Sequence, residues 1–482
     1  MGETKNGNSR NLLIGLLIIV EIRIRTNQEF FGLPASVFGL FTMKYHLITL
    51  GCQMNLSDGE RVISVLNEAG YTWTDKEEEA GLIGILACSV RQKAIDKVYS
   101  RIHKWNKWKN HKNLVTFISG CILPDDHEKF LKLFDITFQM KDLPKLPEMI
   151  SQYGITTSVH LKTGIDPHNE NIEEFWHVQP SYQSNFEAFI PIQNGCDKFC
   201  TFCAVPYTRG REVSRPSKDI IAEVALLVAQ GYKSITLLGQ NVNSYGLDKK
   251  GEELTFAQLL AEIGELGERS NKEFWVYFTS PHPRDMNEDV IEAIAKYKCL
   301  GKQIHLPMQS GDDKVLMRMN RKHNMERYRG MIQSIRRIIP EATIFTDIIV
   351  GFTGETDEQF ENTRKAMEEF KFNMSYTAMY SPRPGATSHR WADDISHDEK
   401  KRRLHILTNE LRKHNIQYNK SMIGKTVRCL VRGEDRKEGF LSALTEGKLI
   451  VRFASEDKSL VGNFVNMKIT GATDFSMEGE MV

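Results

Sequence analysis

The sequence predicts an α/β protein with an N-terminal α/β domain, a partial β/α barrel of six strands and a small C-terminal β-barrel. Two observations carry this prediction. From residue 43 to about residue 416, short apolar runs alternate with amphipathic segments of helical period, which is typical of parallel strands joined by helices. After Gly424 the apolar period falls to two, which is typical of short antiparallel strands.

The composition is that of an ordinary globular chain, with 41% apolar and 26% charged residues among 482. The formal net charge of +1 predicts no partner, so any nucleic-acid surface must be local. Residues 1–42 contain a nine-residue apolar run, too short for a membrane span of about 20 residues. We interpret residues 1–42 as an extension that is unstructured or starts from a misplaced codon, and we expect a cytoplasmic protein without membrane association.

The N-terminal domain is expected at residues 43–160, with strands at 45–50, 82–86 and 115–118 and a helix at 58–69. A cysteine follows each of the three strands. In parallel α/β sheets, ligands gather at the carboxyl ends of the strands, so cysteines far apart in sequence can converge there. These residues are Cys52, Cys88 and Cys121. A polar segment at about 156–183 is predicted to be a linker.

The second domain is expected at residues 182–418, where six strands with helices between them form an incomplete β/α barrel or an open doubly wound sheet, and the small β-barrel is expected at 421–482. The strands are predicted at 188–192, 234–238, 274–278, 303–306, 343–350 and 374–379, and the helices between them at 218–229, 255–266, 287–296, 325–338 and 357–369. A basic helix at 399–416 follows. Polar residues collect just after the strands, at the rim that holds the active site in β/α barrels. Among them are Gln240, Asn241 and Glu355.

The strongest chemical signal is the C-x3-C-x2-C spacing of Cys196, Cys200 and Cys203. Three thiolates on one loop can hold three irons of a cubic [4Fe–4S] cluster and leave the fourth iron open to a small molecule. A structural zinc site is the competing interpretation, but it needs four ligands, and no fourth Cys or His lies nearby in the sequence. The motif therefore predicts an iron–sulfur cluster in a reducing compartment.

The triplet after the first barrel strand, with Phe202 before its last cysteine, resembles the radical S-adenosylmethionine superfamily. Further blocks resemble the methylthiotransferases, and in particular their tRNA branch, the MiaB-type enzymes. These blocks are TLGCQMN at 49–55, ACSVR at 87–91, SGC at 119–121, FCAVPYTRGREVSRP at 202–216, LGQNVNSYG at 238–246 and TDIIVGFTGET at 346–356. The tail from Gly424 resembles the RNA-binding TRAM module, and the resemblance covers about residues 43–470.

The resemblance implies that Cys52, Cys88 and Cys121 hold a second, auxiliary [4Fe–4S] cluster, beside the radical cluster on Cys196, Cys200 and Cys203. The reaction it implies is methylthiolation at C2 of N6-dimethylallyladenosine, at position 37 of tRNA beside the anticodon. Two molecules of S-adenosylmethionine serve, one as methyl donor and one as radical source. The alternative substrates are threonylcarbamoyl-adenosine in tRNA and an aspartate of a ribosomal protein. An alternative of a different class is a cluster-dependent RNA-binding protein without catalysis.

The implied partners are the anticodon stem-loop of tRNA and an electron donor such as flavodoxin or ferredoxin, with the enzyme acting as a monomer. Phe202, Gln240, Asn241 and Glu355 are the residues expected to position S-adenosylmethionine. The chain departs from the family pattern at Leu86-Ala87, at Thr353 and after Cys121, which affects hydrogen bonding around the clusters rather than their ligands.

Two weaker signals remain open in the sequence. The segment 101–112 carries five Lys or Arg residues with Trp105 and Trp108, as either a solvated helix face over packed tryptophans or a surface for tRNA phosphates. Arg209, Arg211 and Arg215 follow the cysteine loop and are expected either to pair with Glu212 or Asp219 or to contact substrate. Cys299 and Cys429 match no cluster motif and are expected to be buried apolar fillers.

Overall fold

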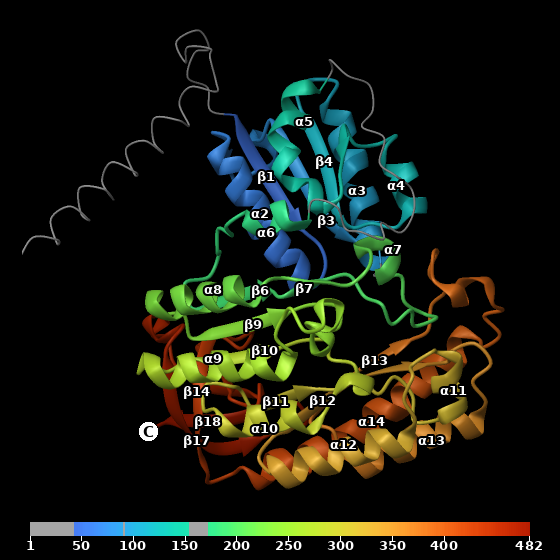
Figure 1. Cartoon of the computed structure of the whole chain (residues 1–482), viewed down its shortest axis with the longest axis vertical. Helices are drawn as coiled ribbons and strands as arrows, with labels where there is room; N and C mark the ends of the chain where they lie inside the picture. Colours follow the sequence, from blue (N-terminus) through green and yellow to red (C-terminus); the bar gives the residue numbers. More distant parts are fainter. Residues whose placement is uncertain (1–42, 90–91, 154–171) are drawn as a thin grey trace, which may run out of the picture. The chain divides into compact units, whose positions relative to one another are not determined.

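The computed structural model describes residues 43–89, 92–153 and 172–482, so the expectation for residues 1–42 lies outside the described residues. The first domain contains a five-stranded parallel sheet in the order β2-β1-β3-β4-β5 (Figure 1). The predicted strands are confirmed as β1 (Lys44–Thr49), β3 (Leu82–Cys88) and β4 (Val115–Cys121). The two-residue edge strands β2 (Thr72–Trp73) and β5 (Ile136–Thr137) were not predicted, because they are too short to show a period.

Helices cover both faces of this sheet. Helices α2 (Gln53–Glu68), α5 (Leu146–Gln152) and α6 (Ile172–His177) share one apolar cluster with the sheet. Helices α3 (Gln92–Trp108) and α4 (Pro124–Phe130) share the cluster on the other face. Helix α6 lies in the segment predicted to be a linker, and its Phe175 and Trp176 are buried in the core of the first domain. The polar residues around this short helix hid its apolar side in the sequence.

The second domain is an open barrel of two three-stranded parallel sheets, in the orders β10-β9-β6 and β11-β12-β13. A parallel bridge between Val276 and Leu300 links the first of these sheets to the segment that leads into β11. The strands are β6 (Glu187–Pro191), β9 (Ser234–Leu238), β10 (Trp275–Phe278), β11 (Gln303–His305), β12 (Thr343–Val350) and β13 (Met374–Met379). The six predicted strands are therefore confirmed, with ends that differ by at most one residue.

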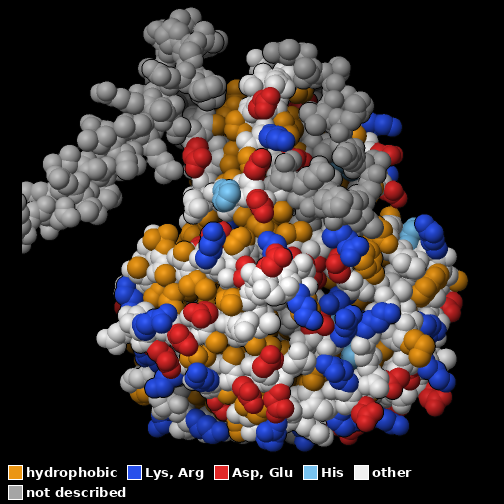
Figure 2. Space-filling model, viewed as in Figure 1, with side chains coloured by type: hydrophobic (Ala, Val, Ile, Leu, Met, Phe, Trp, Pro, Cys, Tyr) orange, Lys and Arg blue, Asp and Glu red, His pale blue; other side chains and the backbone are white. Residues whose placement is uncertain are grey.

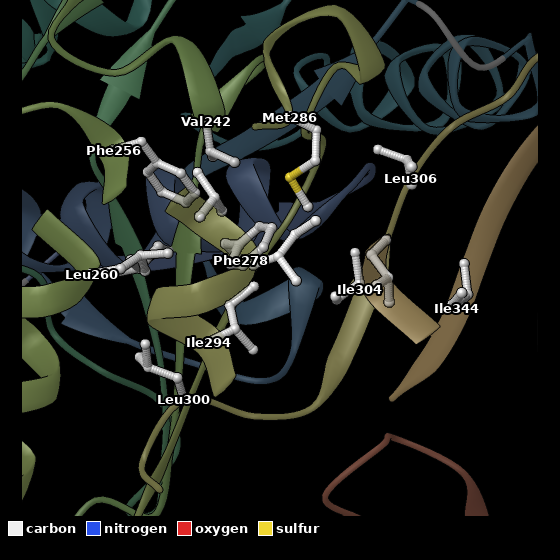
Figure 3. Packing of buried hydrophobic residues seen from close by; sticks show 14 of the residues in the cluster. Val242, Phe256, Leu260, Phe278, Met286, Ile294, Leu300, Ile304, Leu306 and Ile344 are labelled. Atoms are coloured by element: carbon white, nitrogen blue, oxygen red, sulfur yellow. The ribbon is translucent and has the colours of Figure 1, made fainter. Parts of the chain in front are cut away.

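Helices alternate with these strands, and their apolar faces form one core with them. The principal helices are α8 (Ser217–Gln230), α9 (Phe256–Ser270), α10 (Glu288–Lys296), α12 (Met325–Ile338) and α13 (Asp357–Phe370), with the short α7 (Val205–Arg209) and α11 (Asp313–Arg318) and the small pair β7 (Gln193–Asn194) and β8 (Val213–Ser214). Figure 3 shows Phe256 and Leu260 from α9 in the same cluster as Phe278 from β10 and Ile304 from β11. This continuous core holds the strand ends, and hence the site, in a fixed arrangement.

The third domain follows the long helix α14 (His397–Ser421) and is a closed β-barrel, as predicted. Its strand order is β14-β15-β16-β18-β17. Its strands are β14 (Thr426–Glu434), β15 (Phe440–Thr445), β16 (Ile450–Ala454), β17 (Phe464–Ala472) and β18 (Met477–Met481). Leu430 packs against Trp275 and Tyr277 of β10. Two ion pairs, Arg428–Glu273 at 2.6 Å and Arg432–Glu187 at 2.7 Å, also hold this barrel to the second domain.

Basic and acidic side chains are interspersed on the face shown in Figure 2, in keeping with the small net charge. Within the described residues, no helix is long and apolar enough to cross a membrane.

Candidate functional site

The loop of Cys196, Cys200 and Cys203 lies between β7 and α7, at the start of the open barrel. Gly195 begins it with φ of 80°, and a Cβ at this position would lie 2.0 Å from the carbonyl oxygen of Arg211, so only glycine fits. The Gly195 N–H donates to Oε1 of Gln240 at 2.6 Å. Gln240, predicted at the barrel rim, therefore fixes the backbone at the entry to the cysteine loop.

The three thiols of this loop lie in a low-dielectric environment. Cys196 and Cys200 are buried and Cys203 is partly exposed. Burial raises the pKa of Cys196, and burial raises the pKa of Cys203 to about 12, so both thiols keep their protons in the metal-free chain and would release them to iron. Arg321, itself 5% exposed, donates from Nη1 to Cys200 Sγ at 3.4 Å and supplies a compensating positive charge.

The structure brings Cys52, Cys88 and Cys121 together. Cys52 caps the N-terminus of α2, and Cys88 and Cys121 are directly paired residues at the carboxyl ends of β3 and β4. A hydrogen bond with Cys88 and burial together raise the pKa of Cys121, while the charge of Arg209 opposes that shift. The convergence at the strand ends agrees with the sequence-based expectation.

These three cysteines line a cavity of about 820 Å³, a volume in the range of ligand sites in proteins. All three domains contribute to its wall. The polar and thiol groups that line it include Cys52, Cys88, Cys121, Gln240, Ser280, His305, Asp347, Arg432 and Lys448. Aromatic side chains from the barrel strands add Phe278, Phe345 and Tyr376. The cavity can therefore receive a planar, partly apolar ligand next to the N-terminal thiols.

Arg209 is 6% exposed, and it joins the two cysteine sites. It ends α7, the first helix after Cys203, yet its side chain reaches the N-terminal domain. Its Nε donates to Cys121 Sγ at 3.0 Å, and its Nη2 donates to Asp58 Oδ2 at 2.5 Å and to Asn55 Oδ1 at 3.4 Å. The sequence-based expectation that Arg209 pairs with Glu212 or Asp219, or contacts substrate, did not include these partners.

Glu355 is buried near the end of the loop between β12 and α13, two residues before the helix, and only one of its carboxylate oxygens has hydrogen-bond partners. Its Oε2 accepts from the Gly351 N–H at 2.7 Å and from Arg403 Nη1 at 2.8 Å. Its Oε1 is buried and has no hydrogen-bond partner. Because a buried polar atom normally has a partner, this oxygen is an acceptor that a ligand could use.

The other residues expected to bind S-adenosylmethionine lie in mixed surroundings. Phe202 is half-buried with its ring edge-on to Phe352, 6.5 Å between centroids. Asn241 is buried and donates to Ser244 Oγ at 2.7 Å, while its own Oδ1 has no partner. Asn241 thus also keeps one acceptor for a ligand, whereas Phe202 offers only an apolar surface.

The two cysteine triplets fit cubic clusters better than a single ion. Among the described side chains, no group of three His, Cys, Asp or Glu is arranged around one metal ion. A cubic cluster does not require such a group, because each thiolate binds a different iron and the ligands stand further apart. Thiol donors, burial and an arginine on one sulfur of each triplet together match the surroundings in which iron–sulfur clusters are held.

The structure also resolves the two weaker signals. On α3, Trp105 is fully buried and donates to Glu77, and Arg101 and Lys104 both pair with Glu77. Just after the helix, Lys109 pairs with Asp135. These contacts favour the structural interpretation of the basic segment. Arg211 pairs with Asp197 and Arg215 with Glu223, rather than with Glu212 or Asp219. Cys299 and Cys429 are buried in apolar clusters, as expected.

Family models match three separate stretches of the chain. Residues 44–140 match Uncharacterized protein family UPF0004, residues 190–367 match the Radical SAM superfamily, and residues 420–482 match the TRAM domain. A tRNA-2-methylthio-N(6)-dimethylallyladenosine synthase of Actinobacillus pleuropneumoniae is 38% identical over 91% of this chain and 92% of its own length. The synthase of the same name from Chromobacterium violaceum is 38% identical over 91% of this chain and 98% of its own.

The chain belongs to this family of tRNA methylthiotransferases. Among solved structures, a radical S-adenosylmethionine methyltransferase, TsrM from Kitasatospora setae, with cobalamin and a [4Fe–4S] cluster bound, matches with a TM-score of 0.52 over 83% of this chain and 80% of that one. The sequence identity is 13%, so this likeness concerns the fold alone. Within the family pattern, the departure at Leu86-Ala87 leaves Leu86 fully buried and the Ala87 carbonyl bound by Asn55 Nδ2 at 2.9 Å.

Proposed function

We propose that this chain transfers a methylthio group to C2 of N6-dimethylallyladenosine at position 37 of tRNA, using two [4Fe–4S] clusters and S-adenosylmethionine. Cys196, Cys200 and Cys203 are the proposed ligands of the radical cluster, and Cys52, Cys88 and Cys121 those of the auxiliary cluster. The observation that carries the proposal is the shared cavity, since one space of about 820 Å³ is lined both by the N-terminal thiols and by the strand ends of the barrel.

The two clusters and S-adenosylmethionine together supply the one-electron chemistry that an unreactive aromatic C–H bond requires, and no described side chain needs to act as acid or base at that carbon. The protein's part is to position the reactants. Gln240 fixes the backbone of the cysteine loop, and Glu355 Oε1 is proposed to accept from the amino group of S-adenosylmethionine. Asn241 Oδ1 is a second buried acceptor at the same rim.

The cavity wall suits a base removed from its stack. Enzymes that modify a base take it out of the stack into a pocket, which costs least in a single-stranded loop such as the anticodon loop. Phe278, Phe345 and Tyr376 offer aromatic surfaces for the adenine and its apolar dimethylallyl group. Arg432 and Lys448, from the C-terminal barrel, line the same cavity, and because Arg432 pairs with Glu187 at 2.7 Å, Lys448 is the proposed contact for the RNA backbone.

The partners follow from this proposal. The anticodon stem-loop is the macromolecular substrate, a flavodoxin or ferredoxin is the proposed electron donor, and we propose that the enzyme acts in the cytoplasm as a monomer. The TRAM match at residues 420–482 supports contact with RNA by the C-terminal barrel.

The decisive test is nucleoside mass spectrometry of tRNA from a bacterium that lacks its own synthase, complemented with this chain. We expect the methylthio-dimethylallyl-adenosine peak to return and the unthiolated nucleoside to fall. Cys121→Ala and Cys203→Ala should each leave the peak absent. Cys299→Ala is the matched control, because Cys299 is also buried but lies among apolar side chains away from the cavity.

An unchanged nucleoside profile with the wild-type chain would contradict the proposed substrate. Methylthio groups on threonylcarbamoyl-adenosine, or on a ribosomal-protein aspartate, would then identify the alternative substrate with the same chemistry.

A further inference from the structure

The segment that carries the radical-cluster cysteines ends at Arg209, whose side chain binds the other cysteine site. Residues 196–209 hold Cys196, Cys200 and Cys203 at one end and Arg209 at the other. The side-chain contacts of Arg209 reach the N-terminal domain, at Cys121, Asp58 and Asn55. One short segment is therefore bound to both sites.

We propose that Arg209 is a positioning residue that sets the place of the auxiliary cluster relative to the radical cluster and tunes the auxiliary cluster through the sulfur of Cys121. The inference rests on the proposed function, because it takes Cys121 to be a cluster ligand.

The contacts of Arg209 reach the backbone that carries all three N-terminal cysteines. Asn55 accepts from Arg209 and donates from Nδ2 to the carbonyl of Leu50 at 3.3 Å and to that of Ala87 at 2.9 Å. Leu50 lies two residues before Cys52, and Ala87 directly precedes Cys88. A movement of Arg209 would therefore be transmitted to the segments before both cysteines, as well as directly to Cys121.

Arg209 places a permanent positive charge next to Cys121. A guanidinium stays protonated in proteins, and its planar fork allows Nε and Nη2 to bind two groups at once. Asp58, fully buried, compensates part of this charge, and Nε is left to donate to Cys121 Sγ. A hydrogen bond to a cluster-ligating sulfur stabilises the more negative, reduced cluster and raises its potential.

The competing explanation is that Arg209 is only a buried ion pair that stabilises the fold. The second domain offers a matched example of such a pair. Arg215, 5% exposed, binds Glu223 Oε2 at 2.5 Å and contacts no cysteine among the described residues. Arg215→Gln therefore removes a buried arginine from the same region of the chain without removing a contact to sulfur.

The experiment compares the wild-type full-length chain, Arg209→Gln, Arg209→Lys and Arg215→Gln after anaerobic reconstitution with iron and sulfide. Three quantities are measured: iron per chain, the rate at which a chelator removes the auxiliary cluster, and the auxiliary-cluster potential by an EPR-monitored redox titration. The 5′-deoxyadenosine formed per methylthio group is measured with tRNA. Arg209→Lys keeps the charge but cannot bind Asp58 and Cys121 together, and it decides the matter if Arg209→Gln fails to fold.

We expect Arg209→Gln to lose the auxiliary cluster roughly 10- to 100-fold faster, as for other residues that orient metal ligands. Its auxiliary-cluster potential should shift downward, and more 5′-deoxyadenosine should form per methylthio group. Arg209→Lys should lie between Arg209→Gln and wild type, and Arg215→Gln should match wild type in all three cluster properties.

Wild-type potential and chelation rate in both Arg209 variants would overturn the inference, as would equal changes in Arg215→Gln. A wild-type chain that takes up only one cluster would instead contradict the proposed function. Two clusters with no response to Arg209 would contradict only the role assigned to Arg209.

Discussion

Glu355→Gln should weaken the binding of S-adenosylmethionine while leaving the fold of its loop in place. The glutamine keeps the shape of the side chain and can still accept one hydrogen bond from the Gly351 N–H, while Arg403 loses one ion pair but keeps Asp357 and Glu399 as partners. It replaces the unpartnered Oε1, a charged acceptor, with a neutral group. A hydrogen bond to a charged group contributes about 1.5–3 kcal/mol, which corresponds to a rise in Kd of roughly 10- to 150-fold.

The assay is equilibrium binding of S-adenosylmethionine to the reconstituted full-length chain. Glu369→Gln is the control, since Glu369 lies on α13, is exposed, pairs with Arg329 and is outside the site. Burial raises the pKa of Glu355, so wild-type affinity should fall as the pH drops toward that raised pKa, and the variant should lack this step. An unchanged Kd and an unchanged pH profile in Glu355→Gln would refute the assignment of Oε1 to the ligand.

Three further predictions concern stability, cluster content and RNA binding. Burial raises the pKa of Glu60 from 4.5 to about 7, so its contribution favours folding below pH 4.5 and is lost as the pH rises through about 7. Glu60→Gln should therefore stabilise the chain at pH 8.5 by up to about 3 kcal/mol and change little at pH 4, measured by denaturant unfolding, and equal effects at both pH values would contradict this linkage. Gly120→Ala places a Cβ 2.4 Å from the Ala87 carbonyl oxygen beside Cys121 and should remove about half of the bound iron, taking each cluster as an equal share. Gly231→Ala, also at positive φ but with no atom within 4 Å of the added Cβ, should keep the iron, and equal loss in both would point to backbone strain alone. Lys104→Glu combined with Lys107→Glu should leave tRNA affinity unchanged in filter binding, because four of the five cations in the segment 101–112, namely Arg101, Lys104, Lys109 and Lys112, bind groups within their own domain, and a weaker affinity with a smaller salt dependence would place RNA on that segment.

The sequence predicted those parts of the fold that have a clear apolar period. The barrel strands β6, β9, β10 and β12 each contain an apolar run, and the alternation after Gly424 identified the closed barrel. The two-residue strands β2 and β5 exist only through pairing with their neighbours, and helix α6 is too short to show an amphipathic pattern. In each of these cases tertiary contacts, rather than local sequence, decide the structure.

The site was predictable where one loop or one strand end carries the residue. The cysteines and Glu355 are marked by their spacing or by their place after a strand. The partners of Arg209 were not predictable, since Asp58 lies 151 residues away and reaches Arg209 only when two domains dock. The same holds for Arg321 on Cys200, 121 residues apart. The sequence showed that charged residues lie near a cysteine motif, but it did not show which cysteine sulfur each of them would contact.

The direct pairing of Cys88 with Cys121 makes the N-terminal site unusually sensitive to insertions. Side chains alternate between the faces of a strand, so one residue added within β3 or β4 would turn the cysteine behind it to the opposite face. The loops before these strands, at residues 80–81 and 113–114, can change length without altering that alternation. Natural or engineered variation in this domain should therefore accumulate in the loops at the amino ends of the strands.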